Sequence, residues 1–272
     1  MANEPKYFKV EKEGPIVIWK FYNPPRNLWD AETGPEFLQL VESFYQDRNL
    51  RVGIFTSGMP DVFIQHYDVS LLVKMGEQLL QGTLPPPPRR VGFRRDSKPI
   101  IVAINAPLAG GGLELTMSFD FRFMSRAASA AQSEVSVGIL AGGGGTQGMP
   151  RLIGLGRALE IQLTGRRIFA DEAERIGLIT RACDPLRLMP EVMEFARELA
   201  NKPPLAVSLI RRCMYEGMNM TLDDGLALES ELFREAVKSS DALERMRAYV
   251  AVSQDPQRAE ELRKQWEKQA QA

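Results

Sequence analysis

Two glutamates, each close to a cluster of glycines, are the residues of this sequence best suited to chemistry. Glu114 follows glycines 110–112, and Glu134 precedes the glycine run 142–145. A glycine turn leaves the backbone uncovered, so an amide N–H can approach a ligand closely. Such amides stabilise a developing oxyanion, and carboxylates move protons. The two units therefore indicate acid–base chemistry at a polarised carbonyl.

A buried strand and the start of a helix are expected to position Glu114. Residues 100–104 form a short apolar run rich in β-branched side chains, which is typical of a buried strand. After the glycines comes a helix-compatible stretch, whose N-terminus would carry unpaired N–H groups and a partial positive charge. The alternative is tight strand-to-helix packing with Glu114 solvated. A second unit of glutamate and glycines makes this alternative less favoured than one unit would.

Length and charge limit the classes of function. The 272 residues can bury a large core without disulfides. The net charge of −1 gives no electrostatic argument for nucleic acid or an anionic membrane. The N-terminal segment lacks an apolar signal core, and no apolar run approaches membrane-spanning length. We therefore expect a cytoplasmic protein with no nucleic-acid partner and no membrane association.

The cysteines and the single histidine offer no metal site. Cys183 and Cys213 match no metal or redox spacing, and we interpret them as reduced packing residues. His66 is the only histidine, which excludes His-rich metal sites and two-histidine mechanisms. We therefore expect no metal.

Hydrophobic periodicity predicts an α/β region up to residue 185 and helices afterwards. Strands are expected over 7–10, 15–22, 51–56, 100–104, 121–125 and 178–181. In the first region, helices are expected from 33, from about 68 with Asp68 as a possible cap, over 149–164, and over 171–176 with Asp171 as cap. The later helices are expected over 190–200, 204–218, 222–239, 242–252 and 256–269.

The stretch 81–95 combines four consecutive prolines with four arginines. Proline removes backbone donors and stiffens the chain, so we expect an extended surface segment. The arginines, at 89, 90, 94 and 95, fit a solvated face best. A site for substrate phosphates is the alternative.

Three blocks in this order resemble the crotonase superfamily, the enoyl-CoA hydratase/isomerase family. They read AINAPLAGGGLELTMSFDF at 103–121, AQSEVSVGILAGGGGTQ at 131–147 and LTGRRIFADEAERIGLIT at 163–180. The resemblance runs from residue 8 to about 252. It implies an α/β spiral of β-β-α units with an acyl-CoA site over 1–185. It also implies a C-terminal helical region over 186–272 that trimerises, often into a dimer of trimers.

The resemblance also assigns roles to residues. It implies that Glu114 and Glu134 hold and activate water, one of them delivering a proton to the α-carbon. The backbone N–H groups of Tyr67 and Gly111 would form an oxyanion hole for the thioester oxygen. Substrate contacts are expected from residues beside these, namely Gln65, His66, Asp68, Gly110, Gly142 and Gly143. No cofactor is implied, because the coenzyme A thioester is the substrate.

The first oxyanion block departs from the family pattern, which usually reads Ala-Gly-X-Asp. Here it reads Gln65-His66-Tyr67-Asp68, so His66 replaces a glycine. We interpret His66 as a surface or core residue in an altered loop, and a titratable group near the thioester is the alternative. The family's C-terminal acidic-glycine pair is also missing after Asp255, so its contacts to the CoA adenine are not carried over.

Because both glutamates are present, the sequence favours addition of water to a 2-enoyl-CoA through a stabilised enolate. One alternative is an enoyl-CoA isomerase or another enolate-using enzyme, such as a dehydratase, hydrolase or lyase. A catalytically silent acyl-CoA binder is the other. The altered block around His66 is the main support for this second alternative.

Overall fold

Two β-sheets form the centre of the protein. The computed structural model describes residues 4–84 and 97–269. The main sheet has strand order β1-β2-β3-β4-β6-β9, in which β1 and β2 are antiparallel and the other neighbours are parallel. Its strands are β1 (Phe8–Glu13), β2 (Ile16–Phe21), β3 (Val52–Ser57), β4 (Ile100–Ile104), β6 (Phe121–Ser125) and β9 (Arg181–Cys183). A smaller sheet has the order β5-β7-β8, from β5 (Leu108–Ala109), β7 (Ser129–Ala131) and β8 (Arg167–Phe169).

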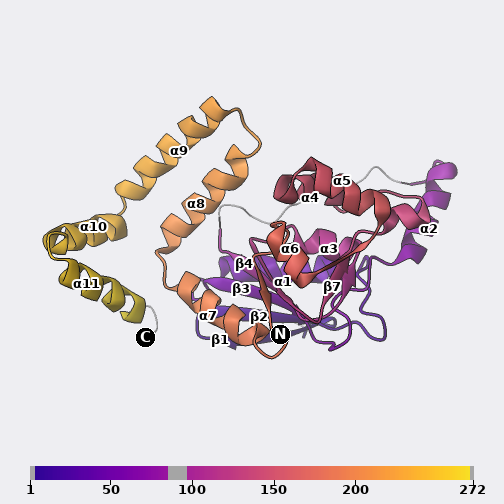
Figure 1. The fold of residues 1–272 in the computed structure, drawn as a ribbon, viewed down its shortest axis with the longest axis horizontal. Helices are drawn as coiled ribbons and strands as arrows, with labels where there is room; N and C mark the ends of the chain where they lie inside the picture. The colour runs from indigo at the N-terminus through magenta and orange to yellow at the C-terminus, as the bar shows by residue number, and fades with distance from the viewer. Residues whose placement is uncertain (1–3, 85–96, 270–272) are drawn as a thin grey trace.

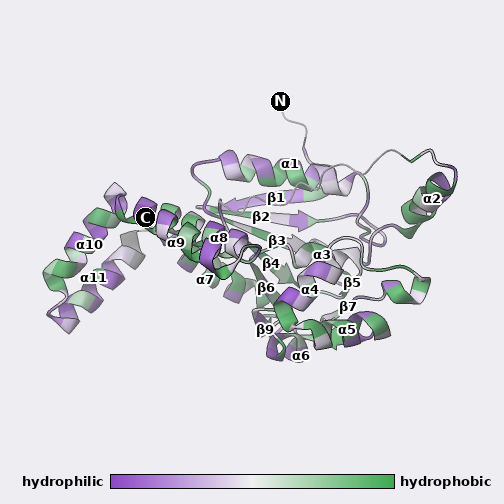
Figure 2. Ribbon diagram, turned by 90° about the horizontal axis from the view of Figure 1, so that it is seen from above, coloured by the Kyte–Doolittle hydropathy of each residue, from purple (hydrophilic) through white to green (hydrophobic). Residues whose placement is uncertain are grey.

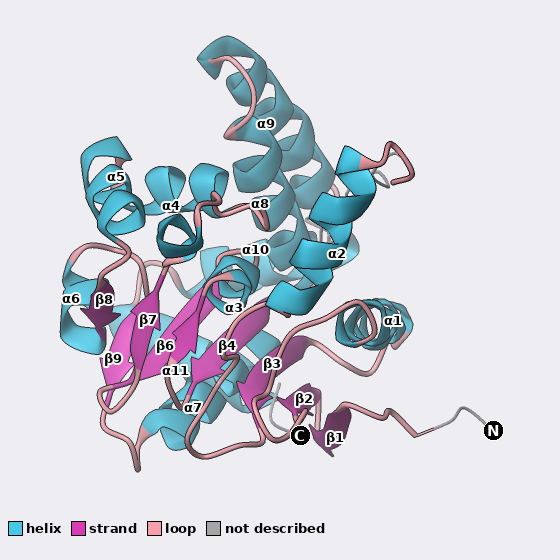
Figure 3. Ribbon diagram, turned by 90° about the vertical axis from the view of Figure 1, so that its right-hand side faces the viewer, coloured by secondary structure: helices cyan, strands magenta, loops and turns pink. Residues whose placement is uncertain are grey.

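Helices cover both faces of the main sheet, which explains why its central strands are apolar throughout. One face packs against α7 (Leu188–Ala200). The other carries an aromatic cluster that includes Trp19, Phe55 and residues of α1 (Thr33–Gln46). Figure 3 shows the sheet between α7 and the helices α3 (Gly111–Thr116) and α4 (Gly145–Ile153). The remaining helices of the α/β part are α2 (Val69–Leu80), α5 (Leu155–Thr164) and α6 (Ala170–Arg175), with a 3₁₀ turn over Glu134–Val137.

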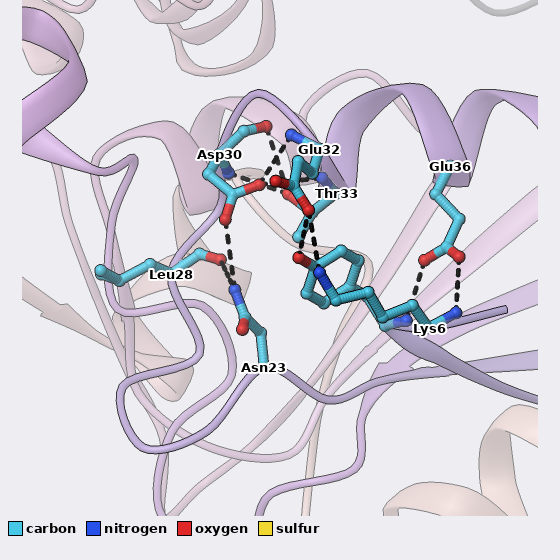
Figure 4. Close-up of polar contacts among 8 residues, drawn as sticks. Lys6, Asn23, Leu28, Asp30, Glu32, Thr33 and Glu36 are labelled. Atoms are coloured by element: carbon cyan, nitrogen blue, oxygen red, sulfur yellow. Dashed lines mark hydrogen bonds and ion pairs between the residues drawn. The ribbon is translucent and has the colours of Figure 1, made fainter.

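Hydrogen bonds at the start of α1 hold the loop that follows β2. The Asp30 carboxylate accepts the backbone N–H of Glu32 and of Thr33 at 2.9 and 2.8 Å. The amide of Asn23 donates to the Leu28 carbonyl at 2.9 Å (Figure 4). These bonds fix loop 23–30 at both ends.

The C-terminal helices extend away from the α/β part as an arm. They are α8 (Pro204–Gly217), α9 (Leu222–Val237), α10 (Ser240–Val252) and α11 (Pro256–Gln269) (Figure 1). Arg211 of α8 anchors the arm, because its Nε and Nη2 donate to the Asp120 carboxylate at 2.9 and 3.1 Å. Tyr215 also donates to Asp120, at 2.9 Å. No described helix is both long and apolar enough to cross a bilayer.

The α/β fold and the helical C-terminal region match the sequence expectations, but several boundaries were wrong. The helix expected over 149–164 is two helices, because Gly154 at φ 82° ends α4. The strand expected over 178–181 begins three residues later, as β9 over 181–183. Asp171 lies in the first turn of α6 and does not cap it, since the N-cap is Phe169. The proline and arginine segment lies outside the described residues from position 85 onwards, and the boundary at 185 remains a prediction.

Candidate active site

The small sheet brings the two glycine-containing units together. Strands β5 and β7 pair in parallel, with Leu108 opposite Ala130 and Ala109 opposite Ala131. The chain segments that follow the two strands therefore leave the sheet side by side. Gly110 N–H donates to the Ala131 carbonyl at 2.9 Å. A Cβ on Gly110 would lie 3.1 Å from Oε1 of Glu134, so this carboxyl group lies directly against the glycine turn.

Glu114 lies on α3 and faces the start of α4. Its side chain is buried, with 6% of the residue exposed. Oε1 accepts the Gly145 N–H at 2.7 Å, which is one of the unpaired donors at the N-terminus of α4. A Cβ on Gly143 would lie 2.5 Å from the other oxygen, Oε2. The bare backbone of the glycine run is therefore what leaves room for this carboxyl group.

Gln132 lies near both glutamates and was not predicted from the sequence. Its Nε2 donates to Glu134 Oε1 at 2.8 Å. A Cβ on Gly145 would approach both Glu114 Oε1, at 3.0 Å, and Gln132 Cδ, at 3.2 Å. Glu114, Gln132 and Glu134 therefore surround one small region. Within the described chain, Gln132 Oε1 and Glu134 Oε2 are buried without a hydrogen-bond partner. Such atoms are rare in folded proteins, which makes this place a candidate site for a bound water or ligand.

The expected oxyanion donors also lie next to each other. Tyr67 forms a parallel bridge with Trp29: the Trp29 N–H donates to the His66 carbonyl at 3.0 Å, and the Asp68 N–H donates to the Trp29 carbonyl at 2.8 Å. In such a bridge the N–H of Tyr67 points away from Trp29. On that side, a Cβ on Gly111 would lie 3.5 Å from the Tyr67 nitrogen. Among the described residues, neither amide has a hydrogen-bond acceptor.

Ile64 places the Tyr67 segment beside the small sheet. It forms a parallel bridge with Leu108, and its carbonyl accepts the Ala109 N–H at 3.2 Å. A Cβ on Gly112 would lie 2.8 Å from the Ile64 Cβ, so α3 begins in close contact with this segment. Burial raises the pKa of the Tyr67 phenol, and the nearby carboxylates of Asp30 and Asp68 raise it further.

The other predicted contact residues are distributed around this centre. Asp68 caps α2 through the Ser70 N–H at 2.9 Å, and its hydrogen bonds to Ser70 lower its pKa. Gly143 touches Glu114, whereas the nearest atom to a Cβ on Gly142 would be the Leu140 carbonyl oxygen, at 3.9 Å. Gln65 and His66 lie at the rim, and both contact Arg26.

An apolar cavity of about 230 Å³ opens beside Glu134. Gln132, Glu134, Thr146 and Gln162 supply the polar part of its wall. The rest of its wall comes mainly from apolar residues, among them Val135, Ile139, Leu140, Leu155, Leu159 and Leu163. The arrangement suits a hydrocarbon chain whose reactive end lies at the carboxyl group.

Two further residues support the site from outside it. Gln162 on α5 donates to the carbonyl of Gly145 at 3.0 Å, and the N–H of Gly145 donates to Glu114. Arg122 donates to the carbonyls of Thr116 and Phe119 at 3.3 and 2.8 Å and so holds the end of α3. Burial lowers the pKa of this guanidinium.

The comparison with known families agrees with this geometry. Residues 11–259 match the model of the family described as enoyl-CoA hydratase/isomerase. The chain belongs to the enoyl-CoA hydratase/isomerase family. It is therefore an enzyme of the enoyl-CoA hydratase type, with the crotonase fold.

Several relatives of this family are similar over almost their whole length. A short-chain-enoyl-CoA hydratase of Clostridium acetobutylicum is 33% identical over 251 residues, which covers 89% of this chain and 93% of the relative. A crotonyl-CoA hydratase of Syntrophomonas wolfei is 32% identical, with 89% and 94% covered. The crystal structure of an enoyl-CoA hydratase from Bacillus anthracis superposes with a TM-score of 0.80 at 28% identity, covering 90% of this chain and 96% of that one.

A substitution at Gly143 tests whether the glycine run positions Glu114. We expect Gly143→Ala to lower kcat by about 10- to 100-fold, because a 1 Å displacement of a catalytic group has effects up to that size. Its Cβ would have to occupy space within 2.5 Å of Glu114 Oε2. Gly156→Ala on α5, where a Cβ would meet no atom within 4 Å, is the control and should keep full activity. Equal activities of the two variants would show that Glu114 does not depend on this contact.

Proposed function

We propose that this enzyme adds water to a 2-enoyl-CoA, with Glu114 and Glu134 as catalytic residues. The observation that supports this most directly is the Glu134 carboxyl group. One of its oxygens is held by Gln132, and the other is buried without a partner in the described chain. It lies beside a glycine turn whose next amide, that of Gly111, is also without an acceptor there.

In the proposed mechanism, the thioester oxygen accepts hydrogen bonds from the N–H groups of Tyr67 and Gly111. This withdraws electrons from the conjugated C2=C3 bond and makes C3 electrophilic. A water held between Glu114 and Glu134 attacks C3 as Glu134 takes its proton, and the electron pair of the double bond moves onto the thioester as an enolate. Glu134 then returns the proton to C2. One oxyanion-hole donor contributes about 2.7–4 kcal/mol to such a step.

The cavity beside Glu134 is the proposed acyl site. Its apolar wall fits a hydrocarbon chain that carries no charge beyond C3. Two similar proteins are named for short-chain-enoyl-CoA and crotonyl-CoA hydration, which makes crotonyl-CoA the first substrate to test. On the side of the protein, the proposed chemistry uses only carboxyl groups and main-chain amides, so it requires no cofactor. The CoA thioester is the substrate.

We further propose that the chain forms a homotrimer, alone or as a dimer of trimers, in the cytoplasm. Several large apolar side chains of the arm are exposed in the single chain. Figure 2 shows the hydrophobic residues along the helices of the arm. The exposed ones include Met214, Met218, Leu222, Phe233 and Val250. Helix α2 likewise buries none of its residues within the described chain. Covering such surfaces with a second copy would gain about 25 cal/mol per Å² of apolar area. Sedimentation of the purified protein gives its oligomeric state.

Incubation with crotonyl-CoA and 2-hexenoyl-CoA tests the proposed reaction. We expect loss of the absorbance of the conjugated thioester and, in H₂¹⁸O, one labelled oxygen on C3 of the product. Conversion of a 3-enoyl-CoA to a 2-enoyl-CoA without label would establish an isomerase in its place. Binding of the 2-enoyl-CoAs without any turnover would establish a silent binder.

A further inference from the structure

The histidine that replaces a glycine in the first oxyanion block is part of a built network. His66 Nδ1 lies 2.7 Å from the Tyr67 carbonyl oxygen, and Nε2 lies 3.1 Å from Nη2 of Arg26. Nε of the same guanidinium donates to Gln65 Oε1 at 2.9 Å. Arg26 therefore holds two consecutive side chains next to Tyr67.

The partners of the imidazole determine its tautomer. A carbonyl oxygen only accepts, so Nδ1 must carry the hydrogen. A guanidinium only donates, so Nε2 must present its lone pair. Both contacts form only when His66 is neutral and protonated at Nδ1. An imidazolium would turn a second N–H towards the guanidinium of Arg26, and two donors cannot form a hydrogen bond with each other.

The loop that carries Arg26 is itself fixed. Asn27 is fully buried at φ 51°, and its Nδ2 donates to Ser57 Oγ at 3.0 Å and to the Phe63 carbonyl at 2.5 Å. The Asn27 carbonyl accepts the Gln65 N–H at 3.3 Å. Asparagine tolerates this left-handed backbone better than most residues. These bonds hold the backbone beside Arg26 next to the segment that carries His66.

From this geometry we propose that Arg26, Gln65 and His66 form a clamp that aims the Tyr67 N–H at the thioester oxygen. The carbonyls on both sides of that amide are tied, that of His66 by Trp29 and that of Tyr67 by the His66 ring. His66 is thus a positioning residue, and the clamp replaces the small residues that the family has in this block. The inference rests on the proposed function for the role of the Tyr67 amide.

His66→Asn separates the two contacts of the ring. It places an amide nitrogen where Nδ1 was, but it leaves Arg26 without its partner at Nε2. It should therefore lower kcat to the same extent as Arg26→Met.

His66→Ala and Arg26→Met test the clamp through kinetics. Each should lower kcat about tenfold with little change in KM, less than the 10²- to 10³-fold loss expected when an oxyanion donor is removed outright. Arg48→Met, at an exposed arginine after α1, is the matched control and should match the unmodified enzyme. An increase in KM alone on Arg26→Met would show that Arg26 contacts substrate and would overturn the clamp. Unchanged kcat in His66→Ala would also overturn it.

A spectroscopic measurement tests the clamp even if the proposed reaction fails. Because the chain has one histidine, long-range ¹H–¹⁵N correlation reports a single imidazole. We expect the Nδ1–H tautomer in the unmodified protein at neutral pH. The Nε2–H tautomer would contradict both contacts and overturn the proposal. If the protein shows the Nδ1–H tautomer but does not hydrate the substrate, the clamp stands and only the proposed hydration is ruled out.

Discussion

Replacement of Glu134 by glutamine is expected to lower kcat for 2-enoyl-CoA hydration by about 10²- to 10⁴-fold, the contribution of a positioned acid–base group. Glutamine has the same shape and can still accept from Gln132 Nε2, so the surroundings should be unchanged. Glu114→Gln should act similarly, since an amide oxygen can still accept the Gly145 N–H. Steady-state kinetics with crotonyl-CoA measure the effect.

A matched control separates the loss of a proton carrier from general damage. Glu194→Gln changes an exposed carboxylate on α7, and both activity and thermal stability should stay the same. The thermal midpoints of Glu114→Gln and Glu134→Gln should also stay within a few degrees of the unmodified protein. Retention of more than a tenth of kcat in either variant would argue against proton transfer by that residue.

Arg211→Met should be the most destabilising of the substitutions considered. Asp120 and Arg211 form an almost fully buried pair, with 8% and 10% of their side chains exposed. Removing one partner of such a pair leaves an uncompensated buried charge, at about 3–5 kcal/mol. The same pair attaches the arm to the loop before β6, so α8 should also lose its fixed position. Thermal or denaturant unfolding gives the loss of free energy.

The control for Arg211→Met is Arg245→Met, which breaks an ion pair on the surface of the arm. Arg245 pairs with Asp241 at 2.9 Å within α10, with about a third and a half of the two side chains exposed. Pairs of this kind contribute about 0–1 kcal/mol, so Arg245→Met should lower stability by no more than that. If Arg211→Met and Arg245→Met lower the free energy of unfolding equally, the burial of the Asp120–Arg211 pair adds nothing to stability.

The sequence was sufficient to predict those parts of the candidate site that are formed by one continuous segment. Residues 100–116 form the expected strand, glycine turn and short helix with Glu114, because each step has a local signal. What joins the segments was not predictable in this way. Strands β5 and β7 have two and three residues, too few to show an alternating pattern, yet their pairing places Glu134 beside Gly110. Single bridges at Ile64 and Trp29 likewise leave no pattern.

Gln132 and Arg26 were missed for a related reason. Each acts through a side-chain contact. Gln132 contacts Glu134, two positions away, and Arg26 contacts Gln65 and His66, about forty positions away. Polar side chains at such places read as ordinary surface residues until the fold is known. His66 shows the same limit: its replacement of glycine was visible, but its partner was not.

The helix that carries Glu114 has only six residues, too few to persist by itself in water. It exists because the glycine turn and β5 hold its first residues and the Arg122 guanidinium holds the carbonyl of its last residue, Thr116. We therefore expect the proposed site to keep its geometry only while these supports are intact. Heat or denaturant should end turnover and melt the central sheet in a single cooperative event, without an inactive but folded form in between.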